Sequence, residues 1–375
     1  MPAIRKYYDA HLTDRFAEKR VLVTGGFGFI GGHVAAKLSK YGARVDVIDI
    51  DASAARPSLL NEGPVPLRQS MKIIEGSIAD FELVNQLFAQ QRYDFVLNMA
   101  AYASTVEKAV DDPLATFDAN SFGVVALLEA MRRNDNVPEM LFHASTDKVY
   151  GELIGDAYDE NDPLGAAGLY DTAKMAADAI TRSYSTVFGI PAVVLRMCNI
   201  FGPYDLNIGS RLLPKSLYSM FAGDRPEPPT LYAGSQGHSR DYLYIDDLVY
   251  TILLLTAESH WRGQAFNSVA CAHLTTPEMI RQVFQSAVSE ANRFDPTRAS
   301  QIERNGIRMM EAEKSAQVLT ITRQHLKSDR LRNAIAFTPL VSLEEGVQKT
   351  VSFYRKYFGT TGEQPSDAVE SEAVA

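Results

Sequence analysis

The amino-acid sequence predicts an α/β fold, a doubly wound parallel sheet followed by a smaller mixed α/β region. Short, β-branched apolar runs alternate with helix-patterned stretches between Lys19 and about Pro203, which is typical of a parallel sheet with helices on both faces. A glycine-rich turn joins the first such run to the first helix, as in Rossmann-type sheets. After Pro203 the alternation stops, and prolines and glycines cluster. We expect the substrate-binding region there.

The individual strands and helices follow from two periodicities. The first predicted strand, "RVLVTGG", is β-branched and ends in glycine, whereas "FIGGHVAAKLSKYG" after it has helical spacing. The same contrast recurs along the chain. Strands are predicted at residues 20–26, 43–51, 71–80, 93–101, 139–146 and 191–202, and helices at residues 29–42, 81–91, 114–133 and 170–188.

Changes in pattern divide the chain into four parts. Residues 1–18 are an N-terminal extension that we expect to form a helix on the first domain. Residues 19–205 form the predicted Rossmann domain, and residues 206–358 mostly bind substrate, with some segments returning to the main sheet. Residues 359–375 are small, polar and acidic, which favours a disordered tail.

Composition and charge exclude several classes of protein. The 375 residues are 46% hydrophobic and 22% charged, as in globular chains, and their net charge of −9 argues against nucleic-acid binding. No apolar run is long enough to span a bilayer and no secretory signal is recognised, so we expect a cytoplasmic protein that does not contact a membrane. Cys198 and Cys271 are interpreted as reduced thiols, and the histidines lack the spacing of a metal site.

The turn "TGGFGFIGG" predicts a dinucleotide-binding site. Gly25, Gly28 and Gly31 stand where a tight turn, a close approach to a pyrophosphate and close helix packing each exclude a side chain. Asp49 ends the second predicted strand, where a carboxylate can accept hydrogen bonds from the adenosine ribose and would repel a 2′-phosphate. The sequence therefore favours NAD over NADP. The alternative is a plain glycine-rich turn with a surface aspartate, because turns collect glycine in any case.

The spacing Gly-x-x-Gly-x-x-Gly resembles that of the extended short-chain dehydrogenase/reductase family, whose members are nucleotide-sugar epimerases and dehydratases. "GLYDTAKMAAD" places Tyr170 and Lys174 on one face of a helix after the fifth predicted strand, like the family's Ser/Thr–Tyr–Lys set. The resemblance makes Tyr170 the base toward a sugar hydroxyl, with Lys174 favouring the phenolate. Thr146, or else Ser145, would hydrogen-bond the same hydroxyl.

"STDKVYG" resembles the Thr-Asp-Glu triad of the family's 4,6-dehydratases, with lysine in place of glutamate. The resemblance implies a nucleotide-sugar dehydratase, which oxidises the sugar 4-position, removes the 5-proton, expels water from the 6-position and then returns the hydride there. Asp147 would protonate the departing hydroxyl, and Lys148 would remove the 5-proton or orient the group that does. A lysine titrates at about 10.4 and is no base until its pKa falls. The alternative is that Asp147 and Lys148 form a structural ion pair at a strand end.

The resemblance covers roughly residues 19–358 and implies further contacts with NAD and with a nucleotide-diphosphate hexose. Ser77 stands where the family typically has aspartate, so a contact with the adenine amino group would lack a carboxylate. The cofactor-binding residues implied are Gly25, Gly28, Phe29, Ile30, Gly31, Asp49, Ser77, Ile78, Ala100, Ala101, Asn120, Tyr170 and Lys174. The substrate-binding residues implied are Ser145, Asn199, Arg211, Lys215, Arg240 and Asn267. For each arginine, a solvated surface position is an equally good explanation.

Two other functions stay open. A nucleotide-sugar 4-epimerase would use the same oxidation, with Asp147 and Lys148 only lining the pocket. A non-catalytic dinucleotide-binding regulator would be expected to lose Tyr170 or Lys174, and both are present. As in relatives, the helices at 114–133 and 170–188 are expected to pair with their symmetry mates in a homodimer.

Overall fold

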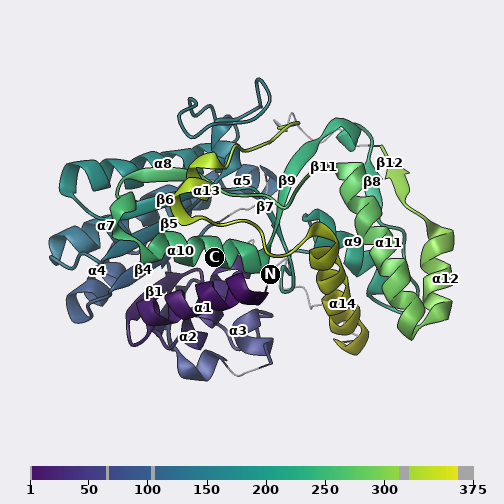
Figure 1. The fold of residues 1–375 in the computed structure, drawn as a ribbon, viewed down its shortest axis with the longest axis horizontal. Helices are drawn as coiled ribbons and strands as arrows, with labels where there is room; N and C mark the ends of the chain where they lie inside the picture. The colour runs from purple at the N-terminus through teal and green to yellow at the C-terminus, as the bar shows by residue number, and fades with distance from the viewer. Residues whose placement is uncertain (1, 65–66, 103–105, 312–320, 362–375) are drawn as a thin grey trace. The chain divides into compact units, whose positions relative to one another are not determined.

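The computed structural model describes residues 2–64, 67–102, 106–311 and 321–361 (Figure 1). The chain divides into two compact units, each built from segments that are far apart in the sequence. Unit 1 comprises Met1–Cys198, Asp246–Val269 and Val318–Leu340, and unit 2 comprises Asn199–Ile245, Ala270–Gln317 and Val341–Ala375.

Unit 1 contains a seven-stranded sheet in the order β10-β6-β5-β4-β1-β2-β3, with every neighbouring pair parallel. The predicted fold class is therefore confirmed. The two central strands are almost completely buried, because helices cover both faces of a doubly wound sheet. The strands are β1 (Arg20–Thr24), β2 (Arg44–Asp49), β3 (Lys72–Glu75), β4 (Phe95–Asn98), β5 (Met140–Thr146), β6 (Ala192–Met197) and β10 (Gln264–Asn267).

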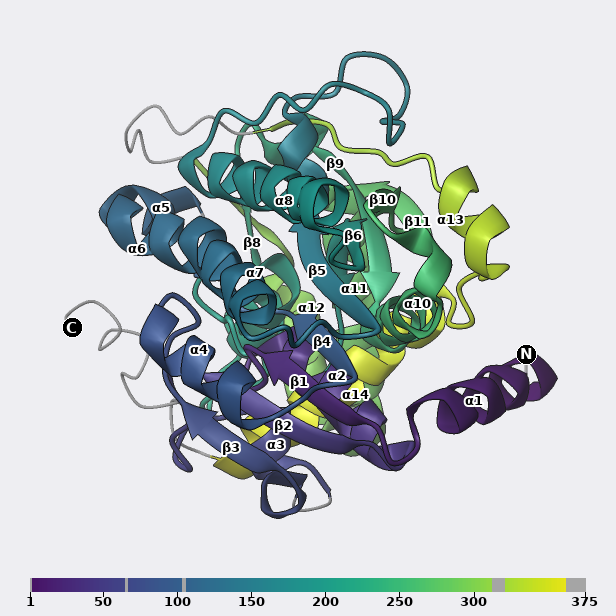
Figure 2. The same ribbon diagram turned by 90° about the vertical axis from the view of Figure 1, so that its left-hand side faces the viewer.

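Helices α4, α7 and α8 lie side by side along one side of this sheet (Figure 2). Their apolar faces meet the sheet in one core that includes Val84, Leu128 and Ala177. The helices of unit 1 are α1 (Pro2–Phe16), α2 (Phe29–Lys40), α3 (Leu59–Glu62), α4 (Phe81–Gln90), α5 (Val106–Asp111), α6 (Pro113–Phe117), α7 (Gly123–Arg133), α8 (Leu169–Phe188), α10 (Ile245–Ala257) and α13 (Asp329–Ile335), with 3-10 turns at Leu67–Ser70, Asp147–Tyr150 and Ser259–Trp261.

The N-terminal segment forms helix α1, which packs on unit 1 beside α10. Leu12 and Phe16 are fully buried. Asp9 accepts hydrogen bonds from the hydroxyls of Tyr41 and Tyr250, and lies 3.0 Å from the Lys37 ammonium of α2. The segment is thus part of the packed unit, since it contributes both core residues and a half-buried polar junction.

The single helix predicted at 114–133 differs in the structure. A π-helical turn, Asp118–Phe122, separates α6 from α7, and the insertion changes which side chains face inward. By length and composition Pro113–Arg133 could cross a membrane, but 56% of its most apolar window is buried inside the protein. We interpret this segment as a helix of the folded unit.

Unit 2 is a mixed α/β unit with two small sheets. In the first, β9 pairs with β7 in parallel and with β11 in antiparallel orientation, and in the second β8 pairs with β12. Its elements are β7 (Asn199–Phe201), α9 (Leu212–Phe221), β8 (Thr230–Tyr232), β9 (Ser239–Tyr244), β11 (Ala272–Thr275), α11 (Thr276–Phe294), α12 (Pro296–Asn305), β12 (Arg308–Met310) and α14 (Leu343–Thr361), with a 3-10 turn at Ser235–Gly237. Most of the tail predicted to be disordered, residues 362–375, lies outside the described residues.

The register of the main sheet brings the expected site residues to one edge. Thr24 of β1 aligns with Asn98 of β4, and Asn98 aligns with His143 of β5. The loops that follow β1, β4 and β5 therefore leave the sheet at the same edge, where ligands of open α/β sheets bind.

Candidate active site

The glycine turn after β1 has no room for side chains. Gly25 has φ of +66°, and a Cβ there would lie 2.8 Å from the backbone of Ala100. A Cβ on Gly31 would lie 2.1 Å from the Gly25 carbonyl oxygen. Gly28 is the N-cap of α2 and leaves the first N–H groups of Phe29 and Ile30 without a side-chain cap. These features fit a pyrophosphate at a helix N-terminus.

Asp49 lies at the end of β2 and is buried. Its Oδ2 accepts a hydrogen bond of 2.9 Å from the Phe27 N–H, which ties it to the glycine turn. Its Oδ1 lies 3.0 Å from Nη1 of Arg56. Arg56 was not predicted from the sequence, because nothing in a loop seven residues after Asp49 indicates that its side chain folds back to the strand end.

The other expected cofactor residues lie at the same edge of unit 1. The Ser77 hydroxyl accepts a hydrogen bond from the Ala79 N–H at 3.1 Å, and Ile78 is buried. The Ala100 N–H donates to Thr24 Oγ1 at 3.0 Å, which fixes the backbone leading to Ala101. These contacts shape the loops after β3 and β4, and the proposed contacts of their side chains with a cofactor stay predictions.

Asn120 lies in the π-helical turn and is almost fully buried. Its amide nitrogen donates to the carbonyls of Tyr102 and Thr116, both at 2.8 Å. Its Oδ1 has no hydrogen-bond partner among the described residues. A buried acceptor is usually satisfied, so this oxygen is suited to a water or ligand group.

Thr146, Asp147 and Lys148 form the turn at the end of β5. Thr146 is the N-cap of the 3-10 turn, and its hydroxyl donates to Asp147 Oδ1 at 3.1 Å. Asp147 is buried, whereas Lys148 is half-buried. The Lys148 ammonium lies 5.6 Å from the centre of the Tyr170 ring. Asp147 therefore bonds back to Thr146, while Lys148 extends toward Tyr170.

Lys174 is buried below Tyr170 on α8, and its ammonium donates to the Ala144 carbonyl of β5. Burial lowers the pKa of Lys174 to about 8, against the opposing effect of Asp178. The same burial, with Lys174 nearby, lowers the pKa of His143 to about 3. His143 is therefore neutral, and its Nδ1 lies 3.1 Å from the Asn98 amide nitrogen.

Ser145 and Asn267 lie in a buried polar network rather than at an open surface. Ser145 donates to Asp178 Oδ2 at 3.2 Å, and Asp178 also pairs with Arg196 at 2.9 Å. Arg196 donates to the Tyr150 hydroxyl, which in turn donates to Asn267 Oδ1, both at 2.7 Å. The direct substrate contacts expected for Ser145 and Asn267 stay predictions. In the structure both residues belong to the buried hydrogen-bond network that links β5, β6 and α8.

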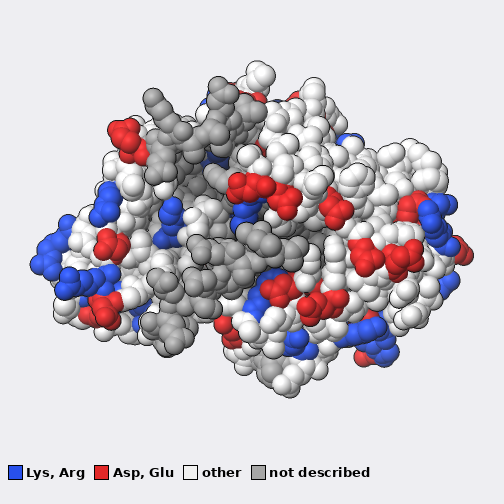
Figure 3. Space-filling view, turned by 180° about the vertical axis from the view of Figure 1, so that it is seen from behind, with Lys and Arg blue, Asp and Glu red and all other residues white. Residues whose placement is uncertain are grey.

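Unit 2 carries the remaining expected residues. Asn199 begins β7, and Arg240 lies on β9. Arg211 is the N-cap residue of α9, and Lys215 lies one turn further along the helix. Arg211 lies 3.3 Å from Asp205, and Lys215 donates to the Tyr232 hydroxyl at 3.2 Å. Acidic and basic side chains both occur on the face drawn in Figure 3.

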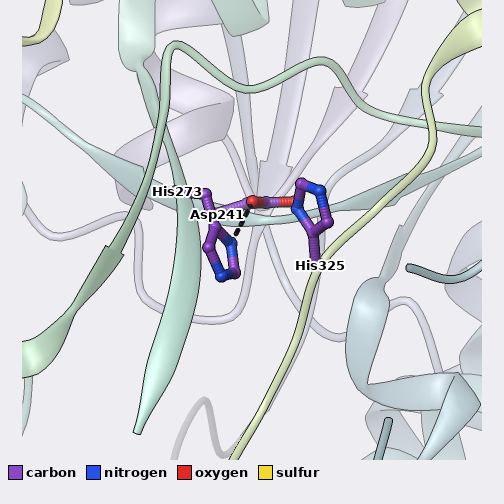
Figure 4. Close-up of side chains that lie close together, drawn as sticks. All are labelled: Asp241, His273 and His325. Carbon is purple, nitrogen blue, oxygen red and sulfur yellow. Dashed lines mark hydrogen bonds and ion pairs between the residues drawn. The ribbon is translucent and has the colours of Figure 1, made fainter. Parts of the chain in front are cut away.

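A metal site was not expected from the sequence. In unit 2, His273 of β11 is hydrogen-bonded to Asp241 of β9 at 2.8 Å (Figure 4). Figure 4 also labels His325, which belongs to unit 1. Within the described residues of either unit taken alone, no three histidine, cysteine or acidic side chains are grouped as metal ligands. The expectation that the protein has no metal site stays a prediction.

The lowered pKa of Lys174 has a measurable consequence. Between about pH 8 and about 10.4, the unfolded chain binds a proton that folded Lys174 has lost, so the free energy of unfolding should rise with pH in this window. Carbon-13 NMR of the lysine side chains should show one resonance titrating near 8 that is missing in Lys174→Met. A Lys174 midpoint near 10.4 would contradict the described burial.

Comparisons with known proteins agree with this geometry. The model of the GDP-mannose 4,6 dehydratase family matches residues 22–350. The dTDP-D-glucose 4,6-dehydratase of Mus musculus is 28% identical over 345 residues, covering 91% of this chain and 90% of the relative.

Two solved structures share the fold. The dTDP-glucose 4,6-dehydratase of Bacillus anthracis, in complex with NAD, has a TM-score of 0.72 and 22% identity, covering 90% of this chain and 97% of that one. The UDP-glucose 4-epimerase of Thermus thermophilus, also in complex with NAD, has a TM-score of 0.70 and 27% identity, covering 90% and 99%. With the family model matching most of its length, the chain belongs to the GDP-mannose 4,6 dehydratase family, among the NAD-dependent nucleotide-sugar dehydratases and epimerases that its motifs resemble.

Proposed function

We propose that this enzyme is an NAD-dependent nucleotide-sugar 4,6-dehydratase. The observation that carries the proposal is the placement of Asp147 and Lys148. Asp147 is buried against Thr146, and Lys148 extends over the Tyr170 ring, so an acid and an amine flank the pair that would oxidise a sugar. The dTDP-glucose 4,6-dehydratases among the relatives support this reaction class.

The residues of unit 1 fit a bound NAD. The absence of a Cβ at Gly25, Gly28 and Gly31 permits the tight backbone packing of the turn before α2, a turn that suits a pyrophosphate at the helix N-terminus. The Asp49 carboxylate would accept hydrogen bonds from the ribose and, although Arg56 offsets part of its charge, would disfavour a 2′-phosphate. When bound, NAD supplies the reversible oxidation of the sugar 4-hydroxyl to a ketone. Asn120, with its unsatisfied Oδ1, stabilises the backbone beside it.

Tyr170 and Thr146 act on the 4-hydroxyl. Tyr170 accepts its proton as the carbonyl forms, and Thr146 holds the same oxygen by a hydrogen bond. Lys174 lies below Tyr170, and a positive charge there favours the phenolate form. Because Lys174 is itself anchored on the Ala144 carbonyl, α8 and β5 fix the base and its supporting cation together.

Elimination then uses the turn after β5. The 4-ketone acidifies the 5-proton, which Lys148 removes as an amine. The electron pair of the broken C5–H bond forms the C5=C6 double bond as the C6–O bond breaks. Asp147 gives its proton to the departing hydroxyl, which leaves as water. The hydride taken from the 4-position would then return to the 6-position, and the Lys148 ammonium would give a proton back to the 5-position, which completes a 4-keto-6-deoxy product. An epimerase reaction would need none of these steps, and this difference separates the two candidates.

The substrate would be a nucleotide-diphosphate hexose. Arg211, Lys215 and Arg240 supply cationic donors for its diphosphate, with Asn199 as a further contact. The Asp205 carboxylate now paired with Arg211 would have to share that guanidinium with the phosphate. Asn267 and Ser145 would act through the buried network. Cys198 and Cys271, both within the described residues, form no disulfide, which supports a cytoplasmic location.

We also propose a homodimer formed through the segment Pro113–Arg133 and α8. The first exposes Leu114 at 85% and Phe122 at 64%, and the second exposes Val187 and Phe188. Large apolar side chains exposed on two neighbouring helices are typical of a surface covered by a partner. Two such pairs would form a four-helix interface.

The reaction is tested with UDP-, dTDP-, CDP- and GDP-hexoses in deuterated water. A 4-keto-6-deoxy product with deuterium at the 5-position is expected. Tyr170→Phe should lower kcat by about 10²–10⁴-fold, whereas Lys148→Ala should still oxidise the sugar but stall before loss of water. Inversion at the 4-position without loss of water would instead establish an epimerase. Binding of NAD without turnover of any sugar would establish a non-catalytic regulator.

The cofactor site is tested by Gly31→Ala. Its Cβ would overlap the Gly25 carbonyl and displace the turn that would bind the pyrophosphate. A loss of about 1–3 kcal/mol of binding free energy corresponds to about 5- to 150-fold weaker binding of NAD. Gly209→Ala is the matched control, because a Cβ there meets no atom within 4 Å. Calorimetric titration with NAD measures the affinity of each variant for the cofactor. Equal affinities for the two would contradict the proposed site.

The homodimer is tested by light scattering, which should give twice the 41.4 kDa of the chain. Leu114→Lys combined with Phe122→Lys should yield monomers, because two charges would be buried without partners. Ile154→Lys, at a position 96% exposed outside these helices, is the control. A wild-type monomer would refute the interface.

A further inference from the structure

A buried carboxylate next to Tyr170 has no role in the reaction described so far. Asp171 is the third residue of α8 and only 3% exposed. Its Oδ1 lacks a hydrogen-bond partner among the described residues. Leaving a buried acidic group unsatisfied is unfavourable, and such groups are concentrated at functional sites. Asp171 is therefore a candidate for a task beyond folding.

The start of α8 is shaped around this carboxylate. Gly168, the N-cap residue, packs so closely that a Cβ there would lie 2.8 Å from Asp171 Oδ2. Tyr170 precedes Asp171, and Lys174 follows it on the same helix, so the carboxylate belongs to the helical turn that carries the expected base. The residue is buried although it lies in the first helical turn.

Lys148 is the charged side chain that acts on Asp171 from another element. Burial raises the pKa of the Asp171 carboxyl, and the Lys148 ammonium lowers it. Among the described residues, no other titratable side chain contributes to this shift. The Lys148 ammonium also lies 5.6 Å from the Tyr170 ring centre. Lys148 is thus within electrostatic reach of both Tyr170 and Asp171.

We propose that Asp171 is a positioning residue for the elimination step, which acts through Lys148 as its counter-charge. The inference rests on the proposed dehydratase function. When the Lys148 amine takes the 5-proton, the C5–H bond breaks, an N–H bond forms and the amine becomes an ammonium. Asp171 stabilises that positive charge, while Asp147 loses its proton to the departing hydroxyl. Charge and protons balance without a further reactant.

The first test reads the pair in the free protein, without substrate. Carbon-13 NMR of the aspartate carboxyls follows the titration of Asp171, identified by its absence in Asp171→Asn. Lys148→Met removes the positive charge and should raise the pKa of Asp171, whereas Lys148→Arg keeps the charge and should leave it near the wild-type value. The two Lys148 variants leave the buried Asp171 itself unchanged. An Asp171 pKa that is the same in all three proteins would overturn the proposal.

The second test reads the elimination step. A negative Asp171 favours the ammonium of Lys148, so in Asp171→Asn the rising limb of kcat against pH should move to lower pH. The plateau should fall about tenfold, because the developing ammonium loses its counter-charge. Oxidation of the sugar should persist, while deuterium exchange at the 5-position slows by the same factor.

The control is Asp14→Asn, an equivalent change at an exposed position of α1, which should alter neither the limb nor the plateau. A purely structural role of Asp171 would lower the plateau without moving the limb, and that result would overturn the inference. Absence of dehydration by the wild-type enzyme would refute the proposed function instead. In that case the NMR result would still decide whether Lys148 and Asp171 are paired.

Discussion

The ion pair between Arg196 of β6 and Asp178 of α8 is the interaction on which the active site of unit 1 depends. Both side chains are buried, so removal of either would leave an uncompensated charge, which typically costs about 3–5 kcal/mol. Asp178 also accepts from Ser145, and Arg196 donates to Tyr150, so the pair joins β5, β6, α8 and the turn after β5. Tyr170 and Lys174 lie on the helix that this pair holds.

Burial is the second constraint, and it determines the charge states of the site. Lys174 is anchored by a backbone carbonyl rather than by a carboxylate, and its pKa falls accordingly. His143, on the neighbouring strand, is neutral for the same reason. Asp171 is shifted in the opposite direction, as expected of an acid. The pKa values of Lys174 and Asp171 are thus shifted toward neutrality, which suits proton transfer near neutral pH, whereas that of His143 is shifted away from it.

The sequence predicted the sheet because strand and helix periodicities are local. All six predicted strands of the main sheet are present, although the last one is divided between β6 and β7. The glycine turn was also predictable, because a position without room for a Cβ requires glycine, and the spacing of these glycines can be recognised in the sequence. The π-helical turn Asp118–Phe122 was not, because the apolar pattern of 114–133 is continuous and does not reveal the insertion. β10 returns to the sheet from residues 264–267, a pairing that only long-range contacts can establish.

The sequence by itself determined the fold class, the dinucleotide turn, the order of Thr146, Asp147, Lys148, Tyr170 and Lys174, and the family that these motifs resemble. Each of these is recorded in residue types at short spacing. Only the tertiary structure decided that Ser145 and Asn267 join a buried network, that Arg56 folds back to Asp49 and that Asp171 lies within reach of Lys148. The reason is physical: burial, pKa and hydrogen-bond partners depend on side chains brought together from distant segments, and no local pattern encodes them.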